Sequence, residues 1–467
     1  MRVSEASSSH GFVLGISELD EKLGDSLRYG AMVSIIGASG TGKTILATTV
    51  CYSNALRGHP CLYASLQEFK DRFYKNFARL GFDLRELESR GLFKFVTLTI
   101  PGTSEIVEEL VSMLENEVIA GKTRVLVIDS LTPLLRVMRD NVSGRAFLQN
   151  NLYTLSKLLN GLLVITLEET GTDETMRADV EHVSDIVIHL RAESNKRLLT
   201  RFASLIKTRG AQIFPVEIPF TIEEGRGIKF WHLTLIKEIP NPLESKLLFP
   251  CRTLGDSVKE ASLNSVVSLV STTRPVPLTE IVTLIYATML LNNLNKVLIF
   301  SYMLPTKKII DEFRKAASGD EVVSEAINKL ITDKILVKSL NPSSMTLQEL
   351  HGEELNTIRE YNPDAVVFLD TQVPEAIHAR ENPIEYIKLL RDQALYSKQS
   401  GRLLIRFSNY SSEEFIKSLQ LISDVTIILD KEKVIIQTSY GSSFEIPAEA
   451  FRNCLIECRD LIRKQKI

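Results

Sequence analysis

Glycine, lysine and threonine recur in residues 37–44 at a spacing that can bind a phosphate. Glycines let the backbone curl so that its N–H groups point at an anion, a lysine adds positive charge, and a threonine hydroxyl can bind Mg²⁺. The pattern therefore predicts a loop for ATP and Mg²⁺, in which Lys43 bridges the β- and γ-phosphates and Thr44 ligates the metal. The loop comprises Gly37, Ala38, Ser39, Gly40, Thr41, Gly42, Lys43 and Thr44.

A carboxylate that can complete the metal site follows a second apolar run. Residues 125–128 are aliphatic, and the run ends at Asp129. At the C-terminal end of a buried parallel strand beside the loop, an aspartate holds the hydration shell of Mg²⁺. The alternative interpretation is a helix N-cap, for which aspartate is also common. The phosphate loop upstream favours the metal role for Asp129.

The elements that must position these residues alternate between strands and helices. Residues 32–36 predict a buried strand that leads into the loop, and residues 44–56 predict the helix that follows it. This alternation predicts an α/β fold, a mostly parallel sheet flanked by helices, with ATP at the C-terminal ends of the strands. Residues 198–230 have an antiparallel pattern. The further parallel strands are expected at 61–66, 125–128, 161–169 and 183–190.

The segment ahead of the loop carries a second pattern, G-I-x-x-L-D-x-x-L-G. Together with the GxSGTGKT loop downstream, it resembles the KaiC family of RecA-type ATPases. The resemblance implies a RecA-like domain that binds ATP and Mg²⁺ and a homo-oligomeric ring, most simply a hexamer. The matching residues are Gly15, Ile16, Leu19, Asp20, Leu23 and Gly24.

The resemblance also implies a catalytic base at the end of the second strand. A glutamate there polarises the attacking water in RecA-like ATPases, and KaiC-like proteins usually carry two adjacent glutamates. This chain has Gln67 followed by Glu68, so Glu68 is the implied base and we expect slow hydrolysis. The alternative for Glu68 is a solvated carboxylate at a helix start.

Two cations near the end of the first half have two interpretations. Lys207 and Arg209 are two residues apart on an expected strand, so their side chains project from the same face. Spacing alone favours a solvated edge strand whose charges block edge pairing. The K-x-R-G sequence, however, matches the position at which KaiC-like ATPases carry residues that reach the γ-phosphate of the neighbouring subunit. The resemblance thus implies that both act in trans.

The second half of the chain repeats the apolar pattern of the first half. Five matches in the same order indicate an internal repeat, and we predict two tandem RecA-like domains, at residues 1–245 and 246–467. The runs 265–271, 296–301, 365–371, 422–429 and 444–447 match 31–37, 60–65, 125–130, 183–190 and 216–219.

The repeat lacks the residues that bind nucleotide. Residues 271–280 contain no glycine, and the alignment places Thr279 and Glu280 where Lys43 and Thr44 stand. Because a glutamate there repels phosphate, we expect a nucleotide-free second domain that serves as a platform for a protein partner. The other replacements are Met303-Leu304 for Gln67-Glu68, residues 438–441 for 207–210, and Asp370, a structural remnant, for Asp129.

The composition is that of an ordinary globular protein. A net charge of −3 argues against a basic domain that neutralises nucleic acid wholesale. The five cysteines form no C-x-x-C pair, and their odd number leads us to expect reduced thiols in the cytoplasm. The most apolar helix candidate, residues 281–291, is too short to span a bilayer, so we expect no membrane association.

Three functions fit these residues. The first is a KaiC-like regulatory ATPase that uses ATP binding or slow hydrolysis to switch what the second domain presents to partners. The alternative is a DNA recombination or repair ATPase of the RecA and RadA class, which the three arginines in residues 136–145 keep open. A third is a scaffold whose loop only holds ATP for assembly, which Gln67 favours. We favour the regulatory ATPase.

Overall fold

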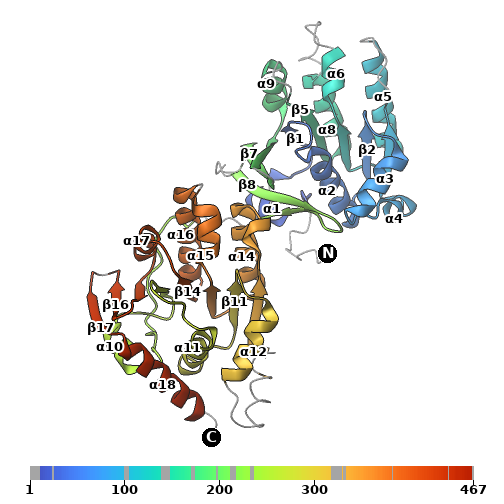
Figure 1. Ribbon diagram of the computed structural model, residues 1–467. Helices are drawn as coiled ribbons and strands as arrows, with labels where there is room; N and C mark the ends of the chain where they lie inside the picture. Colours follow the sequence, from blue (N-terminus) through green and yellow to red (C-terminus); the bar gives the residue numbers. More distant parts are fainter. Residues whose placement is uncertain are drawn as a thin grey trace. The chain divides into compact units, whose positions relative to one another are not determined.

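The computed structural model divides into two compact units, Met1–His232 and Leu233–Ile467 (Figure 1). Gly24 and most of residues 136–145 lie outside the described residues. The structure describes residues 11–23, 26–98, 105–137, 148–169, 174–195, 198–210, 217–231, 236–316, 329, 333–380, 382–439 and 441–464.

The first unit is built on a nine-stranded sheet with the order β3-β2-β4-β5-β1-β6-β7-β8-β9. Strands β1 to β6 pair in parallel, and β7, β8 and β9 continue the sheet in antiparallel pairs. The central strand β1 is buried along its whole length, as expected of an aliphatic strand in a parallel sheet covered on both faces. The strands are β1 (Ala31–Gly37), β2 (Cys61–Ser65), β3 (Phe93–Thr97), β4 (Val125–Asp129), β5 (Leu162–Glu168), β6 (Ile186–Asn195), β7 (Leu198–Thr208), β8 (Glu217–Glu223) and β9 (Gly227–Phe230).

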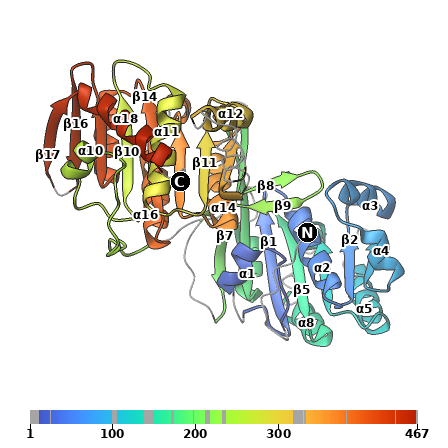
Figure 2. The same cartoon turned by 90° about the horizontal axis from the view of Figure 1, so that it is seen from below.

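Helices cover both faces of this sheet (Figures 1 and 2). Helix α2, which starts at the phosphate loop, packs across β1, β2, β4 and β5. Helices α5, α6, α8 and α9 bury an aliphatic core on the other face. The helices are α1 (Ser17–Leu23), α2 (Lys43–Leu56), α3 (Lys70–Arg79), α4 (Leu84–Ser89), α5 (Glu105–Ala120), α6 (Thr132–Val137), the π-helical turn η2 (Leu148–Leu152), α8 (Tyr153–Leu159) and α9 (Glu174–Val183).

The N-terminal pattern that carries the family resemblance holds a turn against α2. Asp20 accepts the consecutive backbone N–H groups of residues 14–16 at 2.6 to 3.1 Å. Gly15 has a φ of +80°, and a Cβ there would lie 2.0 Å from the Ser53 hydroxyl oxygen in α2. Gly15 and Asp20 therefore stabilise the structure next to the phosphate-loop helix and do not themselves do chemistry.

The second unit is built on an eight-stranded sheet with the order β12-β11-β13-β14-β10-β15-β16-β17. This is the order of β3 to β8 in the first unit with each strand replaced by its repeat. The predicted fold class, α/β with two tandem RecA-like sheets flanked by helices, is confirmed. The strands are β10 (Val266–Ser271), β11 (Val297–Ser301), β12 (Ile335–Ser339), β13 (Ala365–Leu369), β14 (Leu403–Asn409), β15 (Val425–Leu429), β16 (Lys433–Thr438) and β17 (Ser443–Pro447).

Helices again cover both faces. Helices α10, α11, α12 and α18 enclose one core, and α14, α16 and α17 enclose cores on the other face. Among the described residues, no helix combines the length and apolar character needed to cross a membrane. The helices are α10 (Arg252–Ser257), α11 (Leu278–Leu291), α12 (Thr306–Ala316), η3 (Pro342–Ser344), α14 (Leu347–Tyr361), α15 (Gln372–Pro374), η4 (Glu375–Ala379), α16 (Pro383–Gln399), α17 (Glu413–Ile422) and α18 (Glu449–Lys464).

Equivalent hydrogen bonds hold the central strand of each sheet. The Asp185 carboxylate accepts the Met32 N–H at 3.0 Å, and the Asp424 carboxylate accepts the Val266 N–H at 2.8 Å. The N–H of each aspartate donates in return to the carbonyl of the same partner. The two halves thus share their hydrogen bonding as well as their apolar pattern. The serine pairs beside these aspartates are Ser34 with Ser184 and Ser268 with Ser423.

The degenerate loop corrects the alignment at the start of the helix. Helices α2 and α11 both contain 14 residues, and α11 begins at Leu278. Leu278 and Thr279 therefore take the places of Lys43 and Thr44, and Glu280 lies one residue further along. Residues 272–277 replace residues 38–42, which is an insertion of one residue. The predicted alignment required an insertion of two residues and was therefore wrong by one.

The strand register corrects the match for the metal-site aspartate. Ser65 pairs with Asp129, whereas its counterpart Ser301 pairs with Leu369. Leu369 therefore takes the place of Asp129, and Asp370 follows one residue later. The apolar run before the aspartate is one residue longer in the second half. Matching the two aspartates therefore shifted the alignment by one residue.

The cation positions are also shifted by one residue. The N–H of Arg209 donates to the Asp185 carbonyl and the N–H of Ser439 donates to the Asp424 carbonyl, each at 2.9 Å. Ser439 thus replaces Arg209, and Gln437 replaces Lys207. The alignment used the glycines as its anchor, but Gly441 lies one residue further into its turn than Gly210.

A buried polar network distinguishes the second sheet. Arg406, only 1% exposed, pairs with Ser268 in the register that pairs Ile165 with Ser34, so an arginine replaces an isoleucine. Its guanidinium donates to the Gln393 side-chain oxygen at 2.9 Å. The Gln393 amide in turn donates to Glu354 at 2.8 Å, and the Tyr302 hydroxyl donates to the same carboxylate.

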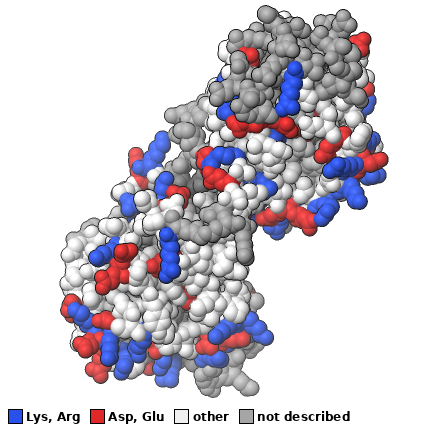
Figure 3. Space-filling view, turned by 45° about the horizontal axis from the view of Figure 1, so that its top comes forward, with Lys and Arg blue, Asp and Glu red and all other residues white. Residues whose placement is uncertain are grey.

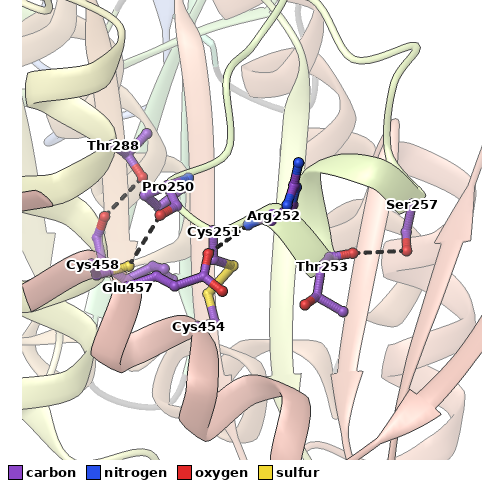
Figure 4. The surroundings of a disulfide bond; sticks show 10 residues. Pro250, Cys251, Arg252, Thr253, Ser257, Thr288, Cys454, Glu457 and Cys458 are labelled. Atoms are coloured by element: carbon purple, nitrogen blue, oxygen red, sulfur yellow. Dashed lines mark hydrogen bonds between the residues drawn. A yellow bond between two sulfur atoms is a disulfide. The ribbon is translucent and has the colours of Figure 1, made fainter. Parts of the chain in front are cut away.

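A disulfide joins the first helix of the second unit to its last helix (Figure 4). Cys251 precedes α10 and Cys454 lies in α18, 203 residues away. The prediction that all cysteines are reduced was wrong for this pair, because a pairing between distant segments leaves no local signal in the sequence. Cys51, Cys61 and Cys458 are free and buried.

Candidate functional site

The phosphate loop has the backbone that its glycines predict. Gly40 and Gly42 have φ angles of +79° and +105°, in the left-handed region that favours glycine. A Cβ at Gly37 would lie 2.3 Å from the Leu190 carbonyl oxygen of β6. Residues 38–40 are exposed at the mouth of the loop. The loop is therefore a cradle that β-carbons at these positions would strain or fill, which fits a bound phosphate.

Lys43 points its ammonium group into this loop. Its Nζ donates to the carbonyls of Gly37 and Ala38, both at 2.9 Å. Burial lowers the pKa of Lys43, and the nearby carboxylates Glu168, Asp129 and Glu169 oppose that shift. The cation thus lies among the loop carbonyls, close to the groups that would receive an anion.

Asp129 ends β4 between β2 and β5, with its carboxylate 8% exposed. One oxygen accepts the Tyr63 hydroxyl at 2.7 Å, and the other accepts the Thr166 hydroxyl. The alternative role as a helix N-cap has no support here, because it is the Ser130 hydroxyl that accepts the Thr132 N–H at the start of α6.

Glu68 lies in the turn between β2 and α3. Its N–H donates to the Ser65 hydroxyl at 3.0 Å, which fixes the turn. Within the described part of the chain, its buried oxygen Oε2 has no hydrogen-bond partner. Burial raises the pKa of Glu68; Arg72 opposes this effect and Asp129 adds to it. A partly buried carboxylate with a free oxygen, close enough to Asp129 to feel its charge, suits a base better than a solvated helix start does.

Sequence reasoning missed two hydroxyls and assigned no role to Glu168 and Glu169 at the end of β5. Tyr63 and Thr166 hold Asp129, and Glu168 is the carboxylate that acts most strongly on Lys43. A polar hydroxyl inside an otherwise apolar strand was the available signal. The partner of each hydroxyl lies on another strand, so the sequence could not identify it.

The acid Glu169 belongs to a separate cluster beside the loop. Its carboxylate contacts the His189 ring nitrogen Nε2 at 2.9 Å and accepts from Arg177 at 2.7 Å. The hydrogen bond from His189 is the main reason that the pKa of Glu169 is lowered. The N–H of Glu169 also donates to the Gly37 carbonyl at 3.0 Å, so this cluster supports the base of the loop.

Lys207 and Arg209 lie away from the loop of their own chain. Lys207 donates to the carbonyls of Glu181 and His182 at 2.6 and 2.9 Å, and Arg209 donates to His182 at 2.8 Å. Both therefore cap the C-terminal end of α9 on the same side, as their spacing predicts. Burial lowers the pKa of Lys207. Asp185 lies 3.5 Å from Arg209 and accepts the Met32 N–H near the start of β1. The phosphate loop follows the other end of β1.

The donor set of the site fits Mg²⁺. The Thr44 hydroxyl and the Asp129 carboxylate offer the oxygen ligands that Mg²⁺ prefers. Among the described residues, no cluster of three or more histidine, cysteine, aspartate or glutamate side chains could hold a metal by itself. Mg²⁺ at nucleotide sites keeps waters and phosphate oxygens as its other ligands, so such a cluster is not required.

Comparisons with known proteins agree with this geometry. A family model described as "ATPase: KaiC" matches residues 13–234. The circadian clock oscillator protein KaiC of Picosynechococcus sp. is 24% identical over 226 residues, which cover 48% of this chain and 43% of that protein. KaiC of Thermostichus vulcanus and KaiC 1 of Synechocystis sp. are each 23% identical over 212 residues, which cover 45% of this chain and 40% of each relative.

The chain thus spans less than half the length of the curated relatives it matches. The matched region contains the phosphate loop, Glu68, Asp129 and both cations. The resemblance seen in the sequence is confirmed: residues 13–234 match the KaiC ATPase family model, and this region is similar to the curated KaiC proteins.

Proposed function

We propose that the first unit binds ATP with Mg²⁺ and hydrolyses it slowly, and that the protein is a regulatory ATPase. The observation that carries this proposal is the grouping of Lys43, Asp129 and Glu68 around the C-terminal ends of β1, β4 and β2. The loop N–H groups and Lys43 would hold the phosphates, while Thr44 and Asp129 would hold Mg²⁺. Bound Mg²⁺ supplies positive charge next to the phosphate oxygens.

Glu68 fits the role of the base that orients the attacking water. Its free, partly buried oxygen supports this assignment, and its raised pKa makes Glu68 a stronger proton acceptor than an ordinary glutamate. The adjacent Gln67 is exposed and cannot accept a proton, so a single carboxylate would act alone. We therefore expect turnover to be slow.

The protein would assemble as a homo-oligomeric ring, most simply a hexamer. Lys207 and Arg209 would complete the ATP site of the adjacent protomer. They lie near the start of β1, whereas the phosphate loop of the same chain follows the end of β1. This separation from their own loop supports action in trans. In the isolated chain both cations are held by α9 carbonyls, which an approaching phosphate could replace.

The second unit would be a nucleotide-free platform for a protein partner. Leu278 and Leu304 stand where the first unit has Lys43 and Glu68, and Leu369 stands where it has Asp129. Pro277, at the N-cap of α11, has no N–H to offer a phosphate. We place the protein in the cytoplasm because its proposed substrate is ATP, although a disulfide such as Cys251–Cys454 is uncommon there.

The DNA repair alternative gains no specific support. Most of the arginine-bearing segment 136–145 lies outside the described residues. On the face shown in Figure 3, basic and acidic side chains are interspersed among the described residues, without an extended area of one sign. A groove that follows a phosphate backbone would need such an area.

ATPase measurements test the proposal. The full chain should hydrolyse ATP slowly and only with Mg²⁺, at a rate that single-stranded DNA leaves unchanged. Lys43→Ala serves as the inactive control. Strong stimulation by DNA would favour a recombination or repair motor, and absence of ATP binding in the wild-type chain would rule out the proposed function.

A further inference from the structure

The Tyr63 hydroxyl is a buried polar group that contacts Asp129 and that the proposed reaction does not use. It lies at the centre of β2, is fully buried, and donates to Asp129 Oδ2 at 2.7 Å. The Thr166 hydroxyl of β5 donates to the other oxygen. Strands on both sides of β4 therefore fix the Asp129 carboxylate, and its plane cannot rotate without breaking one of these bonds.

Aromatic packing holds the Tyr63 ring in place. The ring centroid lies 4.7 Å from that of Phe73 and is stacked on Phe95 at 5.8 Å. The N–H of Phe73 donates to the Phe69 carbonyl in the first turn of α3, and Phe69 directly follows Glu68. Tyr63 is thus packed between the expected metal carboxylate and the helix that follows the expected base.

A second contact extends this arrangement to the phosphate loop. The Thr48 side chain in α2 lies close enough to the Tyr63 hydroxyl to affect its pKa. The Thr48 hydroxyl also donates to the Thr44 carbonyl at 2.7 Å, one turn earlier in α2. Tyr63 thus bonds Asp129 directly, and the neighbouring Thr48 bonds the backbone of Thr44.

We propose that Tyr63 is a positioning residue that orients Asp129 toward Mg²⁺ and so sets the metal affinity of the ATP complex. This inference rests on the proposed ATP site. Residues that hydrogen-bond a metal ligand from behind fix its orientation, and their loss typically weakens metal binding about ten- to a hundredfold.

Replacing Tyr63 with phenylalanine tests this role because it removes one oxygen and keeps the ring. The full chain is saturated with a non-hydrolysable ATP analogue, and Mn²⁺ is titrated as a paramagnetic substitute for Mg²⁺. Tyr63→Phe should weaken Mn²⁺ binding about ten- to a hundredfold while the analogue's affinity in EDTA is unchanged. Tyr52→Phe is the matched control: it removes a hydroxyl from a tyrosine of α2 that packs edge-on against Phe82, and it should bind Mn²⁺ as the wild type does.

A double-mutant cycle shows whether Tyr63 acts through Asp129. In an Asp129→Asn background, adding Tyr63→Phe should cause no further loss of Mn²⁺ affinity. Unchanged Mn²⁺ affinity in Tyr63→Phe would overturn the inference, as would a Tyr63→Phe chain that cannot fold, because the hydroxyl would then be structural. A wild-type chain that does not bind the analogue would instead refute the proposed ATP site, so the two failures are distinguishable.

Discussion

Glu68 and Leu304 occupy the same position in the two repeats. The N–H of each donates at 3.0 Å to the hydroxyl of the serine that ends the preceding strand, Ser65 in the first unit and Ser301 in the second. The turn is therefore kept in both units, while its side chain is a carboxylate in one and aliphatic in the other. The turn that positions the proposed base is therefore kept in this fold even where the carboxylate is lost.

Glu68→Gln should stop hydrolysis and spare ATP binding. The amide cannot accept a proton from water, and the phosphate loop is not altered. We expect turnover to fall about a hundredfold or more, measured as phosphate release, with unchanged affinity for a non-hydrolysable analogue. If turnover stays at the wild-type rate, another group is the base.

Lys43→Ala in the full chain should leave no nucleotide site. The wild-type chain should bind a single nucleotide in calorimetric titration, because the second unit has no lysine in its loop and a proline at its helix N-cap. Two nucleotides per wild-type chain, or one remaining in Lys43→Ala, would show that the second unit binds nucleotide after all.

Mixed assemblies should reveal action in trans. Lys43→Ala lacks a functional loop and Arg209→Ala lacks a cation, so each alone should be inactive. In a mixture, some interfaces would pair an intact loop with an intact Arg209, and part of the ATPase activity should return. A wild-type chain that remains monomeric with full activity would contradict the ring.

Stability should fall with rising pH because of Glu354. Burial raises the pKa of this carboxyl from 4.5 to about 7, against smaller opposing effects of Tyr302, Arg406 and Gln393. Between these two values the unfolded chain has lost a proton that the folded chain keeps, so the contribution of Glu354 to stability is lost as pH rises through this window.

Glu354→Gln removes this titration. Between pH 5 and 8 the wild type should lose about 2–3 kcal/mol of unfolding free energy relative to the variant. Denaturant unfolding of both proteins at several pH values measures the difference. Parallel stability curves would show that Glu354 does not titrate in this range.

Breaking the disulfide should destabilise the second unit. Cys454→Ser should cost about 2–4 kcal/mol under non-reducing conditions, since the bond restricts the unfolded chain. Cys458→Ser, which removes a free buried thiol one turn away, controls for the loss of sulfur. Equal stability of oxidised and reduced wild-type protein would contradict this prediction.

The sequence predicted the residues whose roles depend on local spacing. Residues 37–44 form the expected loop because the glycine conformations, the lysine and the helix start all lie within one turn of chain. Five of the six parallel strands of the first sheet were predicted from their apolar runs, whereas β3 was not. The place of Asp129 at the end of β4 was predicted because it directly ends such a run.

Contacts between distant segments could not be predicted. From the sequence alone Tyr63 is an ordinary strand residue, because its contact with Asp129 depends on the pairing of β2 with β4. The bond between Cys251 and Cys454 likewise depends on the fold, since 203 residues separate them. The one-residue errors at Glu280 and Asp370 arose where loops or runs changed length. The strand register detects such changes, whereas alignment of apolar patterns does not.

The bond between Cys251 and Cys454 also changes what a protease can do to this protein. It closes a covalent ring that includes every strand of the second sheet, from β10 to β17. A single cut within that ring leaves both pieces attached, so a nicked chain would run at full length on a gel until a reductant is added. An unfolding machine that pulls from the C-terminus would reach this crosslink within α18 and would have to thread three segments of polypeptide at once.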